Sequence, residues 1–544
     1  MSERDALMRN IVENPDEDAP RLVFADWCQE NGDEDRAEFI RVQIERARLD
    51  EFDERHQDLE PREVKLLARH RREWTGNWPF QHYSPTVFRR GFIERLEGCG
   101  TGRFNEHIDS LLARHPVREA WLEWPGDRES SERDAEGLLR PPRLSGFTEG
   151  QLRGLGLNHR HRRVIRLREL ERLLASVELR GVRRLVVPHV VDPASPPGFE
   201  HVLFDTFPRI AKHLEALRLP GSVNRPRTLE RAVRSELADT LTCFGLEGAD
   251  LDEGSVRALT ESSLWCGLTE LDLGSLRRGS SFPTLGLAEA VGRSQLRRLN
   301  VVSLSETSPG EYVPTLCRSE RWGELESLKL SGPLHGDLFR EFVNHEHFAR
   351  LRRLHIHAAD LDAEDATVLA EHPNSRGLRE LVLYGCPRLD HHGVARLVNS
   401  PQLSRLVCLD LDRCPIGEET PVALARSPHM SNLRWLGLGP LSDAGVRAIA
   451  DSPFLGNLTR LVRHVDYHQE GVGRWTIGSI IELAESERLP HLTPEMFPDV
   501  FPEDQKARAR IRRLAWEITT PAPGMMEDFG GRTSRPVCGE FFDW

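Results

Sequence analysis

The spacing of leucine residues in the middle of the chain is the feature that most constrains its fold. The pattern L-x-x-L-x-L-x-x-C spans Leu378–Cys386 and returns at Leu406–Cys414, 28 residues later. A short strand with inward-pointing leucines, followed by a turn and a returning helix, fits this pattern. One such unit cannot bury its own apolar face. The pattern therefore predicts a stack of neighbouring units.

The first apolar position of this motif recurs along most of the chain. We count thirteen occurrences, at Val117, Leu152, Val182, Leu214, Leu241, Leu268, Leu296, Leu325, Leu351, Leu378, Leu406, Leu433 and Leu458. The interval between neighbours is 25 to 29 residues from Leu214 onward and 30 to 35 residues before it. This spacing predicts thirteen strands lying side by side, with longer loops at the start of the array.

The repeats resemble leucine-rich repeats, particularly the cysteine-containing and ribonuclease-inhibitor-like classes. The resemblance covers Val117 to Val462 and implies an α/β solenoid shaped like a horseshoe, with parallel strands inside and helices outside. Segments such as Leu389–Leu397 support it, because an apolar residue and an acidic helix cap precede a helical pattern. Only two repeats have cysteine at the last position of the motif, so we expect an imperfect inner ladder.

Residues 1–80 have the apolar spacing and capping residues of an all-helical segment, with a fourth helix expected from Pro61 to Trp74. Asn14–Trp27 and Asn31–Gln43 resemble the small repeat-companion domain found at the N-terminus of many bacterial repeat proteins. The resemblance covers residues 3–50, with Cys28 where an aliphatic residue is common. It implies no biochemical activity, only that a repeat array follows.

The chain therefore divides into four predicted regions. They are a helical repeat-companion domain (1–80), a leucine-rich-repeat solenoid (81–465), a C-terminal helical cap (466–518) and a flexible tail ending in aromatic residues (519–544). Arg463 replaces a core leucine and marks the end of the array. The final Phe-Phe-Asp-Trp of the tail would either dock on the body of the protein or bind a partner as a linear motif.

Charge and composition exclude several classes of protein. Residues 1–60 carry 19 acidic and 8 basic side chains, a net charge of −11 out of −13 for the whole chain, so we expect no nucleic-acid partner. No apolar stretch is long enough to span a membrane, and the N-terminus lacks the features of a signal peptide. Nine cysteines without C-x-x-C pairs favour a reducing, cytoplasmic setting. We therefore predict a cytoplasmic protein, the resemblance to repeat-companion domains implies a bacterial one, and we expect a monomer.

Catalytic motifs are missing from the sequence. A phosphate-binding G-x-x-x-x-G-K-[ST], a metal-binding H-E-x-x-H and a nucleophilic G-x-S-x-G are all absent, so we predict no enzyme activity and no cofactor. His355 and His357 have strand spacing and share one face. Carboxylates on the flanking rows could complete a metal site with them, but we favour a polar and aromatic recognition patch and predict no metal.

The predicted partner-binding patch lies on the exposed concave face, where aromatic and arginine side chains of the kind that dominate interfaces gather. Its members are Arg353, His355, His357, Glu380, Tyr384, Asp410, Asp412 and Trp435. The sequence thus favours a non-enzymatic scaffold that binds a protein partner on this face. Two alternatives remain. One is an adaptor that joins two proteins through the N-terminal helices and the horseshoe, and the other is an enzyme regulator of the inhibitor or GTPase-activating type.

Overall fold

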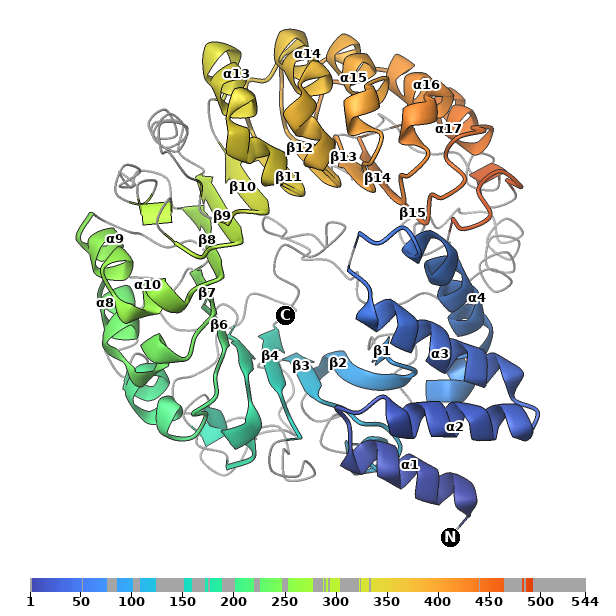
Figure 1. Ribbon diagram of the computed structural model, residues 1–544, viewed down its shortest axis with the longest axis vertical. Coiled ribbons are helices and arrows are strands. Elements are labelled where there is room, and N and C mark those ends of the chain that lie inside the picture. The colour runs from blue at the N-terminus through green and yellow to red at the C-terminus, as the bar shows by residue number, and fades with distance from the viewer. Residues whose placement is uncertain are drawn as a thin grey trace.

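The described residues form one elongated α/β array that curves around a centre (Figure 1). The computed structural model describes residues 2–50, 52–75, 86–100, 108–123, 151–158, 172–174, 177–187, 201–219, 226–246, 253–276, 287, 290–291, 294–303, 322, 324–331, 334–439, 441–463, 482–483 and 486–492. Most of the predicted C-terminal cap (466–518) and all of the predicted tail (519–544) lie outside these residues.

Four helices form the N-terminal module: α1 (Glu3–Glu13), α2 (Ala19–Glu30), α3 (Glu34–Arg48) and α4 (His56–Thr75). Local sequence explains where they begin. Ser2 forms a capping box with Asp5, and the Asp33 side chain accepts from the Arg36 N–H. The prediction that α4 begins at Pro61 is wrong, because the helix starts at His56 and includes the proline.

A single sheet of fifteen strands runs along the rest of the chain in sequence order. The strands are β1 (Thr86–Arg89), β2 (Phe92–Gly100), β3 (Glu119–Glu123), β4 (Gly154–Asn158), β5 (Arg184–Val186), β6 (Ala216–Leu219), β7 (Cys243–Leu246), β8 (Glu270–Leu276), β9 (Arg298–Ser303), β10 (Ser327–Ser331), β11 (Arg353–His357), β12 (Glu380–Tyr384), β13 (Cys408–Asp410), β14 (Trp435–Leu438) and β15 (Arg460–Arg463). All neighbours pair in parallel except β1 and β2. The thirteen predicted strands are β3 to β15, so the leucine-rich-repeat solenoid is confirmed.

Helices cover the outside of this sheet (Figure 1). The described ones are α8 (Pro226–Arg234), α9 (Glu253–Thr260), α10 (Ser263–Gly267), α13 (Gly336–Asn344), α14 (Ala363–Glu371), α15 (His391–Val398), α16 (Glu419–Arg426) and α17 (Asp443–Ala450). The acidic cap predicted for the helix after Leu389 is present on α15, where the Asp390 side chain accepts the Gly393 N–H. Asp362 caps α14 in the same way by accepting from Glu364 and Asp365 N–H groups. Strands therefore line the inside of the solenoid and helices line its outside.

Stacked leucines make the core between the two layers. Leu354, Leu381, Leu409, Leu436 and Leu461 pair in register from β11 to β15, and each is at most 1% exposed. Each fully buried leucine contributes about 1.5–3 kcal/mol relative to an exposed one. Because side chains alternate along a strand, the residues between the leucines point to the inner face of the sheet.

The cysteine at the end of the motif bonds the neighbouring repeat, as its ladder position predicts. The Cys414 Sγ donates to the Leu383 carbonyl oxygen at 3.0 Å. A hydrogen bond to Cys386, together with burial, raises the pKa of the Cys414 thiol. The thiol therefore stays protonated at neutral pH and keeps donating to the carbonyl.

A backbone hydrogen-bond ladder runs along one edge of the strands and fixes their parallel register. The residue after the first apolar position of each repeat donates its N–H to the carbonyl of the equivalent residue one repeat earlier, as Arg379 does to Arg352 at 2.8 Å. We call these residues the rim row: Arg118, Arg153, Arg183, Glu215, Thr242, Thr269, Arg297, Glu326, Arg352, Arg379, Val407, Arg434 and Thr459. The N–H groups of the row link it without a break from Arg118 to Thr459.

Buried serines form a second ladder after the outer helices, which our sequence analysis missed. The Ser427 Oγ donates to the Val398 carbonyl oxygen at 2.5 Å, and the Ser452 Oγ donates to the Ala425 carbonyl oxygen at 2.7 Å. Each hydroxyl also accepts the N–H of the residue two positions later. The sequence signal is a Ser-Pro dipeptide that recurs at Ser427 and Ser452.

We expect Ser427→Ala to lower the free energy of unfolding by about 1–3 kcal/mol, because it removes the donor to a buried carbonyl. Chemical denaturation followed by circular dichroism measures this change. Ser404→Ala is the matched control, since the Ser404 Oγ donates to the Pro401 carbonyl oxygen at an exposed position. A loss at Ser427 no larger than the loss at Ser404 would contradict a structural role for the serine ladder.

The helical module packs against the first strands of the sheet. Phe24 of α2, Ile40 of α3 and Phe92 of β2 share one small apolar core. Gly91, in the turn between β1 and β2, has a φ of +87°, and a Cβ there would lie 2.5 Å from the Ile40 side chain. The hairpin can approach α3 this closely because the residue is glycine.

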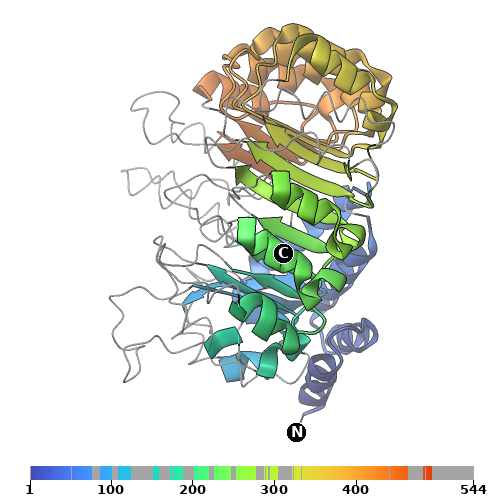
Figure 2. The same ribbon diagram turned by 90° about the vertical axis from the view of Figure 1, so that its left-hand side faces the viewer.

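The same module also reaches the far end of the solenoid. Asp50, which follows α3, contacts Arg352, and Glu60 of α4 contacts Arg434. Figure 1 shows α4 beside the β15 end of the array, and Figure 2 shows the module along one side of it. The sheet itself stays open, because it begins at β1 and ends at β15. No helix among the described segments is long and apolar enough to cross a bilayer.

Candidate protein-binding surface

The predicted patch occupies strands β11 to β14 and the turn after β13. Three rows of paired residues hold seven of its eight members: Arg353, Glu380, Cys408 and Trp435; His355, Val382, Asp410 and Gly437; and His357 with Tyr384. These residues alternate with the core leucines, so they lie on the inner face of the sheet. Asp412 follows β13, and its N–H donates to Asp410 Oδ1 at 2.9 Å. The structure therefore brings the eight residues into one region.

The expectation that this patch is exposed is wrong for six of its eight members. Arg353, His355, Glu380, Asp410, Asp412 and Trp435 are buried, each at most 3% exposed. His357 and Tyr384 are half-buried.

Lateral packing between neighbouring strands contributes to this burial. The Asp410 side chain lies over Gly437 on the next strand, where an added Cβ would be 2.4 Å from Asp410 Oδ1. Adjacent strands are only about 4.8 Å apart, so a side chain of one row rests on the next row. Such contacts depend on which residue the neighbouring strand places alongside. The sequence therefore predicted which side chains point to the inner face of the sheet, but it did not predict how accessible those side chains are to solvent.

A buried charged cluster lies at the centre of the patch. The Glu380 carboxylate accepts from His355 Nε2 at 2.5 Å and lies 3.3 Å from Arg353 Nε. Burial, followed by the charges of Lys329, His357 and Arg353, holds the pKa of His355 well below its usual value. The imidazole is therefore neutral at neutral pH, with its hydrogen on Nε2 facing the carboxylate. This arrangement fixes side-chain positions within the sheet.

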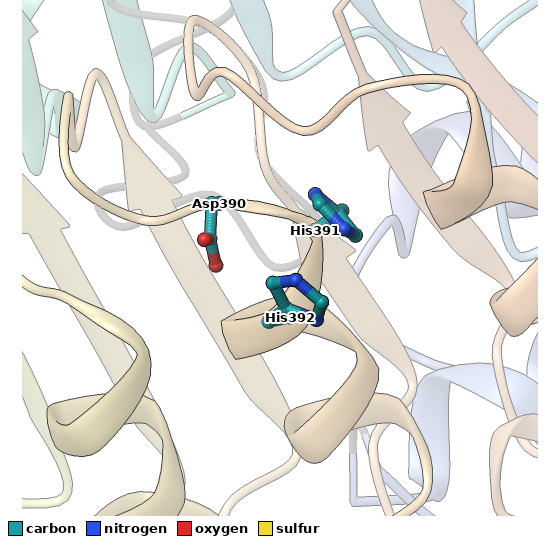
Figure 3. A group of neighbouring side chains, drawn as sticks. All are labelled: Asp390, His391 and His392. Atoms are coloured by element: carbon teal, nitrogen blue, oxygen red, sulfur yellow. The ribbon is translucent and has the colours of Figure 1, made fainter.

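Within the described part of the chain, one group brings three potential metal ligands within 4.8 Å of one another: Asp390, His391 and His392. Figure 3 shows them where α15 begins. The Asp390 Oδ1 caps the helix by accepting the Gly393 N–H at 3.0 Å, and the two imidazole rings contact each other at 3.9 Å between centroids. Among the described residues, neither histidine has a hydrogen-bond partner that would orient it, as metal ligands require. We assign Asp390 a capping role.

A more accessible cluster lies at the end of β12. The rings of His357 and Tyr384 contact each other at 5.2 Å between centroids, and the Arg413 guanidinium lies 5.4 Å from the centre of the Tyr384 ring. Arg413 is exposed and has a φ of +59°. We call His357, Tyr384 and Arg413 the edge cluster. Our sequence analysis missed Arg413, although its place directly before the ladder cysteine Cys414 marks it as a turn residue.

No family model matches the chain, and no curated protein matches it. Among solved structures, a chain of the yeast Rad7–Elc1 complex is similar, with 14% identity, a TM-score of 0.40, and coverage of 87% of this chain and 98% of that chain. A chain of the TLR13–ssRNA13 complex has 15% identity, a TM-score of 0.32, and coverage of 65% and 49%, so this chain spans about half of its length. Neither likeness carries an argument about function.

Proposed function

We propose that the protein is a non-enzymatic interaction scaffold whose solenoid binds a protein partner on its concave face. The proposed site consists of the predicted patch, namely Arg353, His355, His357, Glu380, Tyr384, Asp410, Asp412 and Trp435, together with Arg413. The observation that carries the proposal is the edge cluster, a half-buried tyrosine between a histidine and an exposed arginine. Tyrosine and arginine are enriched among the residues that dominate binding energy at interfaces.

The buried members of the patch support this role by holding the edge cluster in place. Glu380, His355 and Asp410 make side-chain hydrogen bonds inside the sheet, next to the strand ends that carry His357 and Tyr384. A surface built on paired strands loses little conformational entropy when a partner binds. Affinity in this proposal comes from complementarity to a preorganised backbone.

We expect Tyr384→Ala combined with Arg413→Ala to weaken partner binding by about tenfold or more, as the loss of two interface anchors does. The partner is first identified by crosslinking and mass spectrometry from the native cell. It is then purified and titrated against the full chain by calorimetry.

Arg396→Ala is the control for this experiment, because Arg396 is exposed on α15 at the outside of the solenoid. It should leave the affinity unchanged. Trp435 is buried, so any effect of Trp435→Ala on affinity would reflect changed packing of the sheet and not the loss of a direct contact with the partner. Equal affinity for the wild-type chain and the Tyr384/Arg413 variant would place the binding site elsewhere.

We also propose that the protein is a monomer in a bacterial cytoplasm and that residues 3–50 form a repeat-companion domain. Free thiols at Cys28, Cys243, Cys266, Cys386 and Cys414 support a reducing compartment.

We propose no nucleic-acid partner, and the rim row supports this. Several of its arginines are paired with acidic side chains, as Arg183 is with Glu215 at 2.9 Å and Arg297 with Glu326 at 2.5 Å. Five of the seven arginines in the row are paired with a carboxylate, which reduces the positive charge available for binding a phosphate backbone.

A further inference from the structure

Two charged anchors join the helical module to the rim row near the end of the solenoid. In the first, the Asp50 carboxylate accepts from both terminal nitrogens of Arg352, at 2.9 Å and 2.5 Å. This two-pronged geometry is the strongest that an arginine forms with a carboxylate. The Phe52 ring lies beside it, 4.6 Å from the Arg352 guanidinium and 5.0 Å from the Arg353 guanidinium. An acid and an aromatic ring together thus engage two neighbouring arginines.

The second anchor lies three repeats further along. Glu60 Oε2 accepts from Arg434 NH1 at 3.0 Å and lies 3.9 Å from Arg46 NH2. Burial raises the pKa of Glu60, but the charges of Arg46 and Arg434 outweigh it and lower the pKa overall. The hydrogen bond from Arg352 likewise lowers the pKa of Asp50 to about 2. Both carboxylates are therefore ionised at neutral pH.

Hydrogen bonds hold the described residues of the segment between the anchors, which are 50 and 52–60. The Asp50 Oδ1 accepts the Phe52 N–H at 3.1 Å, which holds the ring next to the carboxylate. The Asp50 carbonyl oxygen lies 3.0 Å from His56 Nε2, and Arg46 Nε donates to His56 Nδ1 at 3.3 Å. The acid and the aromatic ring are therefore presented together, as one recognition unit.

This junction differs in kind from the junction at the other end of the module. Against β2 the module shares an apolar core, whereas the contacts described between residues 50–60 and the rim row are ion pairs and cation–π contacts. The Asp50–Arg352 pair is solvent-accessible, so it is individually weak and screened by salt, whereas the Glu60–Arg434 pair is largely buried and is screened less. The segment stays bound because its covalent link gives it an effective concentration on the order of millimolar.

We propose that Arg352, Arg353 and Arg434 form a binding site for an acidic protein segment that carries an aromatic residue, and that residues 50–60 occupy this site within the chain until such a partner displaces them. The inference rests on the proposed function, because Arg353 belongs to the proposed partner site. The inference goes beyond the proposed function in two ways. It specifies the chemistry of the partner segment, and it identifies residues 50–60 as an internal competitor for the site.

The side chains of the site favour an acidic peptide over other anions. A guanidinium can form a bidentate pair of hydrogen bonds with a carboxylate and stack on an aromatic ring at the same time, which an ammonium group cannot do. Here the Arg352 guanidinium does both, because it donates two hydrogen bonds to Asp50 and lies 4.6 Å from the centre of the Phe52 ring. A ligand with charge alone would use only half of these contacts.

The test uses the full chain and a fluorescent synthetic peptide with the sequence of residues 50–60. Asp50→Asn, Phe52→Ala and Glu60→Gln together give an opened variant, in which the internal segment no longer competes. We expect fluorescence anisotropy at low ionic strength to show at least tenfold tighter binding of the peptide to the opened variant than to the wild-type chain. Adding Arg352→Glu to the opened variant should reverse this gain at least tenfold.

Matched controls separate recognition from charge and from misfolding. Asp53→Asn removes one negative charge from the segment, as Asp50→Asn does, but Asp53 pairs with Arg55, so peptide binding should equal that of the wild type. Arg388→Glu in the opened variant should have no effect, because Arg388 pairs with Asp362 at an exposed position. A peptide with arginine in place of Asp50 should recover binding to the opened chain that carries Arg352→Asp. This rescue shows that the variant is folded.

Three results would each overturn the inference: equal peptide affinity for the opened and wild-type chains, no loss on Arg352→Glu, or equally tight binding of a single-stranded oligonucleotide. The third would mean that the site recognises charge alone. Failure of the proposed function has a different signature, because it is read from the native partner and the Tyr384/Arg413 variant. A peptide that does not bind, alongside a partner that still depends on Tyr384, would remove this inference and leave the scaffold function standing.

Discussion

Glu94→Leu is expected to lower the free energy of unfolding of the junction between the helical module and the sheet by about 3–5 kcal/mol, the cost of removing one partner from a buried ion pair. Arg21 of α2 is fully buried, and its NH2 lies 2.7 Å from Glu94 Oε1 on β2. Burial lowers the pKa of Arg21 to about 10, so the guanidinium is still charged at neutral pH. Arg90 pairs with the same carboxylate at 2.8 Å. The substitution therefore leaves two guanidinium groups beside an apolar side chain.

Chemical denaturation gives the global change, and amide hydrogen exchange in α2 and β2 locates it. Asp26→Asn is the control for an exposed ion pair, because Asp26 and Arg41 are both solvent-accessible, and we expect it to cost less than about 1 kcal/mol. The double variant Arg21→Met with Glu94→Leu should recover most of the loss, since it removes both buried charges. A Glu94→Leu variant as stable as Asp26→Asn would show that the pair does not hold the junction.

The features that the sequence predicted correctly are those set by local periodicity. Apolar residues with the spacing of Leu351, Leu354 and Ile356 define a strand and its buried face, whatever the neighbouring repeat contains. The same holds for Asp390, which caps α15 as its position before an apolar helical pattern predicts. The count and order of the repeat strands follow from such local rules, because each unit packs only on its neighbours.

The features that the sequence did not predict depend on which residues meet across repeats or across the whole chain. The burial of Asp410 follows from Gly437 on the next strand, and the contact of Asp50 with Arg352 joins positions 302 residues apart. The acidity of residues 1–60 was visible, as were the arginines of the rim row. Nothing in the local pattern of either segment indicated that the two would pair, because horseshoe curvature brings the ends of the array together.

A second large loss of stability is expected at the aromatic cluster behind β10 and β11. Phe342 of α13 is fully buried, stacks on Trp322 at 5.1 Å between ring centroids, and meets Phe348 edge-on at 5.2 Å. Phe342→Ala removes the ring from both partners and leaves a cavity, at a cost of about 3–5 kcal/mol. We expect this loss to appear in chemical denaturation of the full chain.

The position of the loss tests whether the array behaves as a chain of nearest neighbours. In a solenoid, stability is a sum of repeat terms and interface terms, so damage at one repeat weakens that place first. We expect faster amide exchange in β10, β11 and α13 of the Phe342→Ala protein, with β4 to β7 little changed. Glu341→Ala, one residue earlier and exposed, should stay within about 0.5 kcal/mol of the wild type. Uniformly faster exchange across all strands would mean that the solenoid unfolds as one cooperative unit, held together by the contacts of the helical module at both of its ends.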